Sequence, residues 1–183
     1  KNAVELTKTA RDMADVMLST DAKHHPVRLR HELEGELSEI RSSYAEALIT
    51  VDGGIPDVTV CADDMLDSLF RNLLKNAIQH NDKATPTVNI SVMERDGTAV
   101  VSIADNGPGV PDDLKDDIFD KGEKGLESEG TGIGLYLVQT LVDSYGGDVW
   151  VEDRSEHSSS DSHQQDGNSE SEGAVFVVSL PRA

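Results

Sequence analysis

The chain has 183 residues, of which 16 are basic and 35 acidic, giving a formal net charge of −19. This excess of carboxylates argues against a nucleic-acid backbone or an anionic membrane as a partner, because like charges repel. A chain of this length predicts one domain with an appendage rather than two full domains. The single cysteine, Cys61, excludes an internal disulfide framework and suits a reducing compartment.

No apolar run reaches the length needed to span a membrane, and the first residues lack the pattern of a signal peptide. We therefore expect a cytoplasmic piece of a longer protein, since the sequence begins at Lys1, and a membrane anchor elsewhere in the full length stays open. The acidic residues are spread along the chain, which favours a salt-rich cytoplasm where counter-ions screen self-repulsion. The alternative is an ordinary solvated acidic surface.

Residues 1–22 are predicted to form a helix that ends a helical bundle. Apolar residues recur there at alternating spacings of three and four, as in a coiled-coil seam. The seam positions are Ala3, Leu6, Ala10, Met13 and Met17. Residues 21–26 then break the helix, since Pro26 cannot donate a hydrogen bond and restricts the residue before it.

A second helix is predicted over residues 27–45, because apolar residues recur on one of its faces. These residues are Leu29, Leu33, Leu37 and Ile40. Residues 48–51 and 58–61 follow as two strands around an Asp-Gly-Gly turn, a pattern typical of a hairpin.

The third predicted helix carries polar residues on one flank. Asp63 is placed to cap this helix, and a broad apolar stripe defines its buried face. The stripe consists of Met65, Leu66, Leu69, Phe70, Leu73, Leu74, Ala77 and Ile78. The flank therefore presents Asn72, Asn76 and His80, and the two asparagines, four residues apart, can face one ligand.

Residues 88–93 and 98–104 alternate as strands around Asp96-Gly97, a second hairpin signal. The second of these strands delivers Asp105 to the end of the sheet, where ligands commonly bind. The remaining predictions are a short acidic helix (112–119), a charged glycine-rich loop (120–129), a helix (132–145) and strands over 148–151 and 174–180. Between these last strands, residues 154–173 are serine-rich and acidic, which predicts a disordered insert.

An asparagine side-chain oxygen can hold Mg²⁺, which prefers oxygen ligands and bridges the phosphates of a phosphoryl donor. We assign this role to Asn76, with Asn72 beside it. An isolated asparagine on a helix surface is more often simply solvated. The glycine-rich segments downstream favour a ligand instead.

The first of these segments, Asp105-Asn-Gly-Pro-Gly109, forces a tight turn in which a nucleotide can lie against backbone. Its carboxylate can accept a hydrogen bond from the exocyclic amine of adenine and repels the carbonyl of guanine. The second segment, Gly130-Thr-Gly-Ile-Gly134, opens a helix whose free N–H groups form an anion site. Lys121 and Lys124 can fold onto phosphates as a lid, with plain solvation as the equal alternative.

Taken together, these motifs resemble the ATP-binding catalytic domain of sensor histidine kinases, within the gyrase, chaperone and mismatch-repair ATPase superfamily. The resemblance covers residues 27–181, and the acidic composition adds the expectation that the chain comes from a halophilic archaeon. Its motifs are Asn72 to Asn81 as the N box, Asp105 to Gly109 and Gly130 to Leu135 as the glycine boxes, and Ile118-Phe119 as the F box. The resemblance implies an α+β fold, a two-layer α/β sandwich of the Bergerat type with a mixed sheet, helices on one face and a preceding bundle helix.

The resemblance also implies a site for ATP and Mg²⁺. The implied nucleotide-binding residues are Asn72, Asn76, His80, Asp105, Gly107, Gly109, Lys121, Lys124, Gly130, Thr131, Gly132, Ile133, Gly134 and Leu135. Asn76 is implied as the metal ligand, and Asn72, Asn76 and Lys124 as the catalytic residues. Domain boundaries follow, with residues 1–22 from the dimerisation and phosphoacceptor bundle and residues 27–183 as the catalytic domain.

The resemblance further implies a homodimer through the bundle and a response-regulator receiver domain that takes the phosphoryl group from phosphohistidine. The acceptor histidine is expected on a bundle helix outside this piece. His31-Glu32 has the histidine-acid pair with which such an acceptor begins, but it lies downstream of the bundle segment, which argues against it.

Superfamily members that hydrolyse ATP carry a glutamate four residues before the magnesium asparagine, and here that position is Asn72. An amide cannot take a proton from water as a carboxylate can, which favours transfer to a histidine over hydrolysis. Two alternatives stay open, an ATPase that acts as a conformational clamp and a non-catalytic nucleotide-sensing module.

Overall fold

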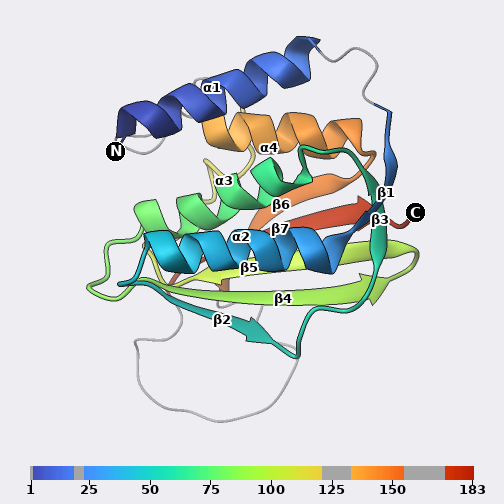
Figure 1. The fold of residues 1–183 in the computed structure, drawn as a ribbon. Coiled ribbons are helices and arrows are strands. Elements are labelled where there is room, and N and C mark those ends of the chain that lie inside the picture. The colour runs from blue at the N-terminus through green and yellow to red at the C-terminus, as the bar shows by residue number, and fades with distance from the viewer. Residues whose placement is uncertain (1, 19–22, 121–132, 155–171) are drawn as a thin grey trace.

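The computed structural model describes residues 2–18, 23–120, 133–154 and 172–183 (Figure 1). The helices are α1 (Asn2–Leu18), α2 (Leu29–Ser43), α3 (Leu66–Gln79) and α4 (Ile133–Ser144). The strands are β1 (His25–Arg28), β2 (Leu48–Asp52), β3 (Thr59–Ala62), β4 (Thr87–Arg95), β5 (Thr98–Asp105), β6 (Asp148–Asp153) and β7 (Ala174–Pro181).

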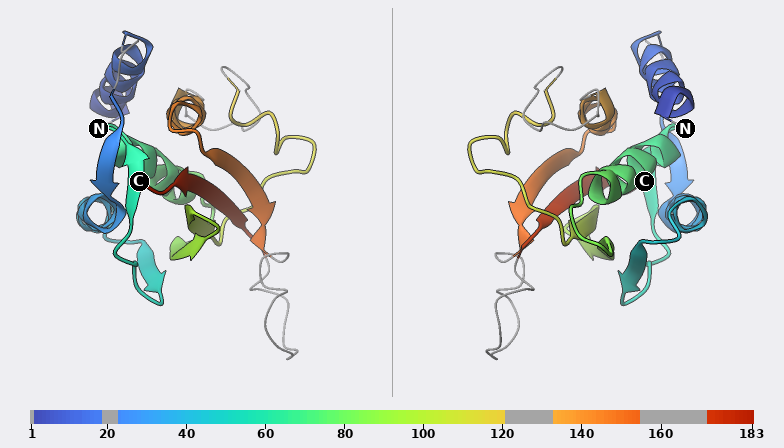
Figure 2. Two further views of the ribbon diagram at one scale, coloured as in Figure 1. Left: turned by 90° about the vertical axis from the view of Figure 1, so that its right-hand side faces the viewer. Right: turned by 90° about the vertical axis from the view of Figure 1, so that its left-hand side faces the viewer.

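Five strands form one mixed sheet in the order β2-β4-β5-β7-β6, with β2 parallel to β4 and the other pairs antiparallel. Helices α2, α3 and α4 lie on one side of this sheet, and α1 lies beyond them against α4 (Figures 1 and 2). The buried face of the sheet carries Val88, Ile90, Val101, Ile103, Phe176 and Val178. The predicted α+β sandwich with helices on one face is confirmed.

Helix α3 is the centre of the helical layer, because its apolar stripe is buried against both neighbouring helices and the sheet. The helix begins one turn after Asp63, and its N-cap residue is Met65. Asp63 instead caps the turn that precedes the helix: its Oδ1 accepts the Met65 N–H at 2.9 Å and also the hydroxyl of Tyr145. The carboxylate thereby ties the start of α3 to the end of α4.

The helix predicted over residues 27–45 begins later, at Leu29. Residues 25–28 form strand β1, which pairs antiparallel with β3 and places Val27 opposite Val60. The Leu29 N–H continues this contact by donating to the Val58 carbonyl at 3.0 Å. The tertiary partner β3 therefore keeps the first residues of the expected helix extended.

The hairpin predicted around residues 52–54 is wrong. Strands β2 and β3 do not pair with each other: β2 joins the large sheet beside β4, and β3 joins β1 in a separate two-stranded sheet. Gly53 and Gly54 both have positive φ, 67° and 77°, and Pro56 follows them without an N–H to continue a ladder. This turn directs the chain away from the sheet rather than back along it.

The acidic helix predicted over residues 112–119 is also wrong, because the segment forms successive turns. Leu114 N–H donates to Pro111 at 2.9 Å and Ile118 N–H to Leu114 at 3.0 Å. Four aspartates at 112, 113, 116 and 117 would place like charges four residues apart on a helix, which disfavours it. The segment is held in place by the buried side chain of Phe119. Its ring packs edge-on against the ring of Phe176, with 6.1 Å between the two ring centroids.

The second predicted hairpin is confirmed, with Arg95 opposite Thr98 and a two-residue turn whose φ values are 49° at Asp96 and 80° at Gly97. Strand β5 ends at Asp105, as expected. Helix α4 ends before Gly146, where φ is 73°. These three features depend on contacts within a few residues.

The first predicted helix is confirmed over residues 2–18, as α1. The side chain of Met13 is buried against the domain, whereas Met17 is 54% exposed, and the side chains of Ala3 and Leu6 lie outside what the structure describes. Across the described ranges, none of the helices combines the length and apolarity required to cross a bilayer.

Candidate nucleotide-binding site

A cavity of about 300 Å³ lies where the C-terminal end of α3, the end of β5 and the start of β7 meet. This volume is at the lower end of the range of small-molecule sites, roughly 300–1,000 Å³. Its lining residues are Asn76, Gln79, His80, Asn81, Asp82, Asp105, Pro108, Gly109, Val110, Ile118, Leu135, Ala174 and Phe176. The cavity therefore joins residues from the N box, the first glycine box and the F box.

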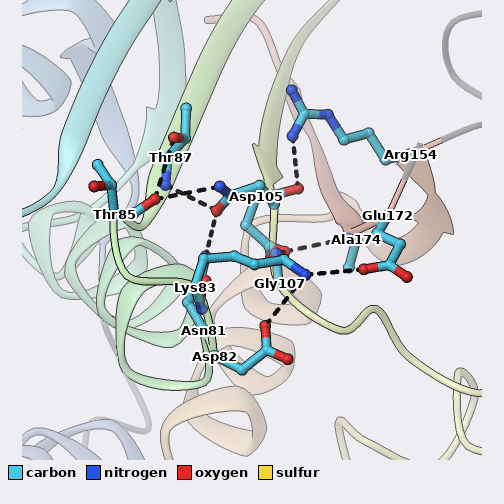
Figure 3. A network of polar contacts seen from close by, with 11 residues as sticks. Asn81, Asp82, Lys83, Thr85, Thr87, Asp105, Gly107, Arg154, Glu172 and Ala174 are labelled. Carbon is cyan, nitrogen blue, oxygen red and sulfur yellow. Dashed lines mark hydrogen bonds and ion pairs between the residues drawn. The ribbon is translucent and has the colours of Figure 1, made fainter. Parts of the chain in front are cut away.

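Asp105 is the buried carboxylate of this cavity. Its Oδ1 accepts the N–H groups of Gly107 at 2.9 Å and Ala174 at 3.2 Å (Figure 3). No donor among the described residues reaches Oδ2. Burial raises the pKa of Asp105, and the two backbone N–H groups and the charge of Arg154 oppose that rise. The arrangement fixes one oxygen and leaves the other as an acceptor for a ligand.

An ionised carboxylate oxygen can only accept hydrogen bonds, so Oδ2 selects a ligand edge that donates. The exocyclic amine of adenine donates, whereas the carbonyl of guanine at the equivalent position does not. The apolar walls formed by Val110, Ile118 and Phe176 suit the faces of a flat base. The cavity is thus chemically suited to adenine.

The glycines after Asp105 allow backbone to approach closely. A Cβ on Gly107 would lie 3.1 Å from Asp105 Oδ1 and 3.5 Å from the backbone of His80 and Asn81. Gly109 has a φ of 76°, which side chains other than hydrogen rarely allow. The predicted tight turn is present. Both positions favour glycine, Gly107 because a side chain would crowd its neighbours and Gly109 because of its positive φ.

Asn106, which sequence analysis treated only as part of this turn, connects three segments. Its Oδ1 accepts the Asn81 amide at 2.6 Å and the Thr87 N–H at 2.9 Å, and its Nδ2 donates to the Thr85 carbonyl at 3.3 Å. These bonds hold the chain after α3 against the ends of β4 and β5. One wall of the cavity is positioned by them.

Of the predicted residues, Asn76, His80, Asp105, Gly109 and Leu135 line the cavity together. Burial lowers the pKa of His80, so its imidazole is neutral at pH 7.

Asn72 lies elsewhere, at the contact between α3 and α4. Its amide donates to the Ser68 carbonyl of its own helix at 2.7 Å, and a Cβ on Gly134 would lie 3.0 Å from its Oδ1. Ile133 and Gly134 are the first residues of α4 that the structure describes, and neither lines the cavity. The side chain of Asn72 therefore contacts the described beginning of α4 rather than the cavity.

Several predictions fall on residues outside the described ranges. These are the phosphate and lid residues Lys121, Lys124, Gly130, Thr131 and Gly132, together with most of the predicted insert over 154–173. The two ends of that insert are described, and both contact the site. Sequence analysis did not predict that the start of β7 contacts the site. The continuous apolar run from Ala174 to Val178 is the signal that indicates a buried strand there.

Gly173 lies directly against the backbone of Asp105. The substitution Gly173→Ala is expected to lower the free energy of unfolding by more than about 2 kcal/mol. A Cβ would lie 1.9 Å from the Asp105 carbonyl oxygen, and φ is 138°. Gly53→Ala is the control, because φ is 67° but nothing lies within 4 Å of the added carbon; about 1 kcal/mol is expected. Urea denaturation measures both. Equal losses would contradict the steric argument.

Residues 61–183 match the model of the histidine kinase-, DNA gyrase B- and HSP90-like ATPase family, and the chain belongs to that family. It is 30% identical over 155 residues to the signal transduction histidine-protein kinase BaeS of Escherichia coli (strain K12), a match that covers 79% of this chain and 33% of BaeS. The chain thus spans about a third of the length of that relative.

Two solved structures share the fold. Full-length ShkA in complex with AMPPNP has a TM-score of 0.74 and 24% identity, covering 100% of this chain and 36% of ShkA. ThkA in complex with the response regulator TrrA has a TM-score of 0.70 and 18% identity, covering 99% of this chain and 49% of that one. Family, fold and relatives together define an ATP-binding domain of the kind that sensor histidine kinases carry.

Proposed function

We propose that this chain is the phosphoryl-donor domain of a two-component sensor histidine kinase, which binds Mg-ATP and delivers the γ-phosphoryl group to a histidine. The observation that carries the proposal is the buried Asp105, with one oxygen held by backbone N–H groups and the other left for a ligand, in the cavity that Asn76 also lines.

The donor set suits a magnesium ion that arrives with the nucleotide. Among the described residues, no group of three or more His, Cys, Asp or Glu side chains could hold a metal by itself. Mg²⁺ commonly binds through one or two protein oxygens, substrate phosphates and water. Asn76 would supply the amide oxygen, and the ion when bound would neutralise charge on the phosphates.

In the proposed reaction, a neutral imidazole nitrogen of the acceptor attacks the γ-phosphorus. A phosphorus–nitrogen bond forms, the bond to the β–γ bridging oxygen breaks, and ADP leaves with that electron pair. The imidazole is itself the nucleophile, so the chain contributes positioning and charge neutralisation rather than a base. Asn72 is consistent with this, because its amide cannot act as a base and bonds its own helix.

The acceptor is proposed to lie on a bundle helix outside this chain, with α1 as the end of the dimerisation bundle. His31 is exposed on α2 and lines a groove separate from the nucleotide cavity. A receiver domain is the proposed next acceptor, supported by the ThkA–TrrA complex, whose fold includes a region like this chain. A conformational-clamp ATPase is the second candidate, and a nucleotide-sensing module the third.

One experiment separates the three functions. A protein extended upstream of Lys1 is incubated with γ-labelled ATP, and label on protein is tested for acid lability and base stability. The kinase predicts acid-labile, base-stable label. Released phosphate without labelled protein indicates the ATPase, and ATP binding with neither product indicates the sensor.

Asp105 should make the chain discriminate between ATP and GTP. Asp105→Ala is expected to weaken ATP binding by about 10- to 100-fold, because a hydrogen bond to a charged group contributes about 1.5–3 kcal/mol. GTP should compete poorly against wild type. Titration calorimetry gives both affinities, and equal competition by the two nucleotides would remove Asp105 from base recognition.

The matched control is Asp96→Asn, which removes one charge from an exposed turn whose positive φ asparagine tolerates. Asp105→Asn adds a second test, because its Oδ1 can still accept both backbone N–H groups while an NH₂ group would face adenine. We expect ATP binding to fall without loss of stability, since the raised pKa of Asp105 means that ionisation lowers folded stability as pH rises.

We also propose that the charge of −19 reflects adaptation to a salt-rich cytoplasm, as in a halophilic archaeon. The melting temperature should then rise by several degrees, on the order of 10 °C, between low and molar KCl, because counter-ions screen repulsion between surface carboxylates. Differential scanning calorimetry over a KCl series measures this. A melting temperature that does not rise contradicts the adaptation.

A further inference from the structure

Arg154, the residue after β6, reaches the end of β5 at Asp105. Its Nη1 donates to the Asp105 carbonyl at 3.2 Å, and its backbone N–H donates to the Gly173 carbonyl, also at 3.2 Å (Figure 3). The side chain is half-buried. It therefore spans from the β6–β7 connection to the residue proposed to read adenine.

The other end of the same connection meets Asp105 from β7. Ala174 donates its N–H to Oδ1, and Gly173 packs against the Asp105 carbonyl. Glu172 forms an ion pair with Lys83 at 2.9 Å, which joins this end to the loop after α3. Both ends of the β6–β7 connection are thus hydrogen-bonded to Asp105, which lines the nucleotide cavity (Figure 3).

We propose that Arg154 is a positioning residue for Asp105: it holds the Asp105 main chain in place and its charge keeps the buried carboxylate ionised, ready to accept from adenine. This inference rests on the proposed role of Asp105 in ATP binding. Arg154 does not line the cavity and acts through Asp105 rather than on the nucleotide.

The electrostatic balance at Asp105 explains why a cation is needed. Burial raises its pKa, and only two backbone N–H groups and Arg154 act against that effect. The other ionisable groups nearby are His80 and Asp82 in the cavity wall, and the paired Lys83 and Glu172. Burial lowers the pKa of His80, so near neutral pH this histidine adds no compensating positive charge.

Loss of the Arg154 charge should therefore raise the pKa of Asp105 further. ATP binding needs the ionised carboxylate. As the pH is lowered, the variant should therefore lose ATP binding at a higher pH than wild type does. For Arg154→Gln we expect the midpoint of this loss to move up by roughly half a pH unit or more. Glutamine removes the charge and is also shorter than arginine, so Arg154→Lys, which keeps the charge, is needed beside it to separate the charge from the hydrogen bond.

The test measures ATP dissociation constants by titration calorimetry from about pH 5 to about pH 8, a range that spans raised carboxylate pKa values. The variants are Arg154→Gln, Arg154→Lys and Arg182→Gln, each also combined with Asp105→Asn. Arg182→Gln is the matched control, because that arginine pairs with Glu94 away from the cavity. Unfolding curves at each pH establish that the variants are folded.

Arg154→Gln should shift the midpoint, Arg182→Gln should not, and the shift should vanish in the Asp105→Asn background. Arg154→Lys should give a smaller shift in the same direction, since a hydrated ammonium keeps the charge but not the geometry. This second variant decides the question if Arg154→Gln does not fold.

An unchanged midpoint in the Arg154 variants, with ATP binding still weakened by Asp105→Asn, overturns the positioning role and leaves the proposed function standing. A shift that persists in the Asp105→Asn background also overturns it. If Asp105→Asn leaves ATP affinity unchanged, the proposed adenine recognition itself fails. The failures of the two proposals are therefore distinguishable.

Discussion

Asn76→Ala should reduce Mg²⁺-dependent binding and transfer of the ATP γ-phosphoryl group by more than about 100-fold while the chain stays folded. Altering residues around a metal ligand commonly changes metal affinity 10- to 100-fold, and loss of the ligand itself should do more. Asn76 is only partly buried and lines the cavity from the last turns of α3, where alanine is a good helix former.

The measurement is an ATP titration with and without Mg²⁺, followed by the label-transfer assay in the extended protein. Asn89→Ala serves as the control, since this β4 asparagine bonds Asp52 at 2.8 Å and does not line the cavity. The ATP affinities of the two variants should differ when Mg²⁺ is present and should be equal when it is absent. A magnesium-dependent affinity that survives Asn76→Ala would remove Asn76 from the metal site.

Arg71→Met should be the most destabilising single substitution in the helical layer. Arg71 is 9% exposed, and its Nη2 lies 2.9 Å from Glu36 Oε1 and 2.8 Å from Asp67 Oδ2. Removing it leaves Glu36, 6% exposed, as an uncompensated buried charge. Breaking such a pair costs about 3–5 kcal/mol, which lowers the melting temperature of a chain of this size by roughly 10 °C.

The network also connects α1 to the domain. Asp12 accepts a hydrogen bond from Ser68 at 3.0 Å and lies 3.7 Å from Arg71 Nη1. Calorimetric melting measures the stability of Arg71→Met, and Glu36→Gln/Arg71→Met is the second variant. Because the double variant removes the stranded charge, it should recover about half of the loss. No recovery would contradict the charge argument.

The deficit of Arg71→Met should depend on pH. Burial raises the pKa of Glu36, and Arg71 opposes that rise, so loss of the arginine raises the pKa further. A carboxyl whose pKa is higher folded than unfolded binds more protons when folded, and stability falls as pH rises. The gap to wild type should therefore shrink at acidic pH. A pH-independent gap would assign the loss to packing.

Sequence analysis predicted α3, the β4–β5 hairpin and the end of α4 because each depends on short-range patterns. The apolar stripe of α3 repeats with helical period, and Asp96-Gly97 supplies the positive φ angles that a two-residue turn requires. Asn76 and Asp105 could be chosen for the same reason, since each lies at a fixed offset from such an element.

The errors concern pairing between distant segments. Strand β2 pairs in parallel with β4, from Leu48 opposite Thr87, and no local turn signals such a pairing. The last two residues of strand β1, Val27 and Arg28, were predicted as the start of a helix, because their partners in β3 lie more than 30 residues downstream. Local propensity cannot weigh a partner whose position depends on the rest of the fold.

The sequence by itself determined the family motifs, the helical layer with its buried stripes, and the choice of Asn76 and Asp105 as candidate nucleotide-binding residues. Only the tertiary structure decided what holds those residues in place. Ala174, 69 positions after Asp105, fixes one carboxylate oxygen, and Arg154 holds its main chain. The physical reason is that a buried carboxylate needs hydrogen-bond donors, and the strands that supply them to Asp105 become neighbours only when the sheet forms.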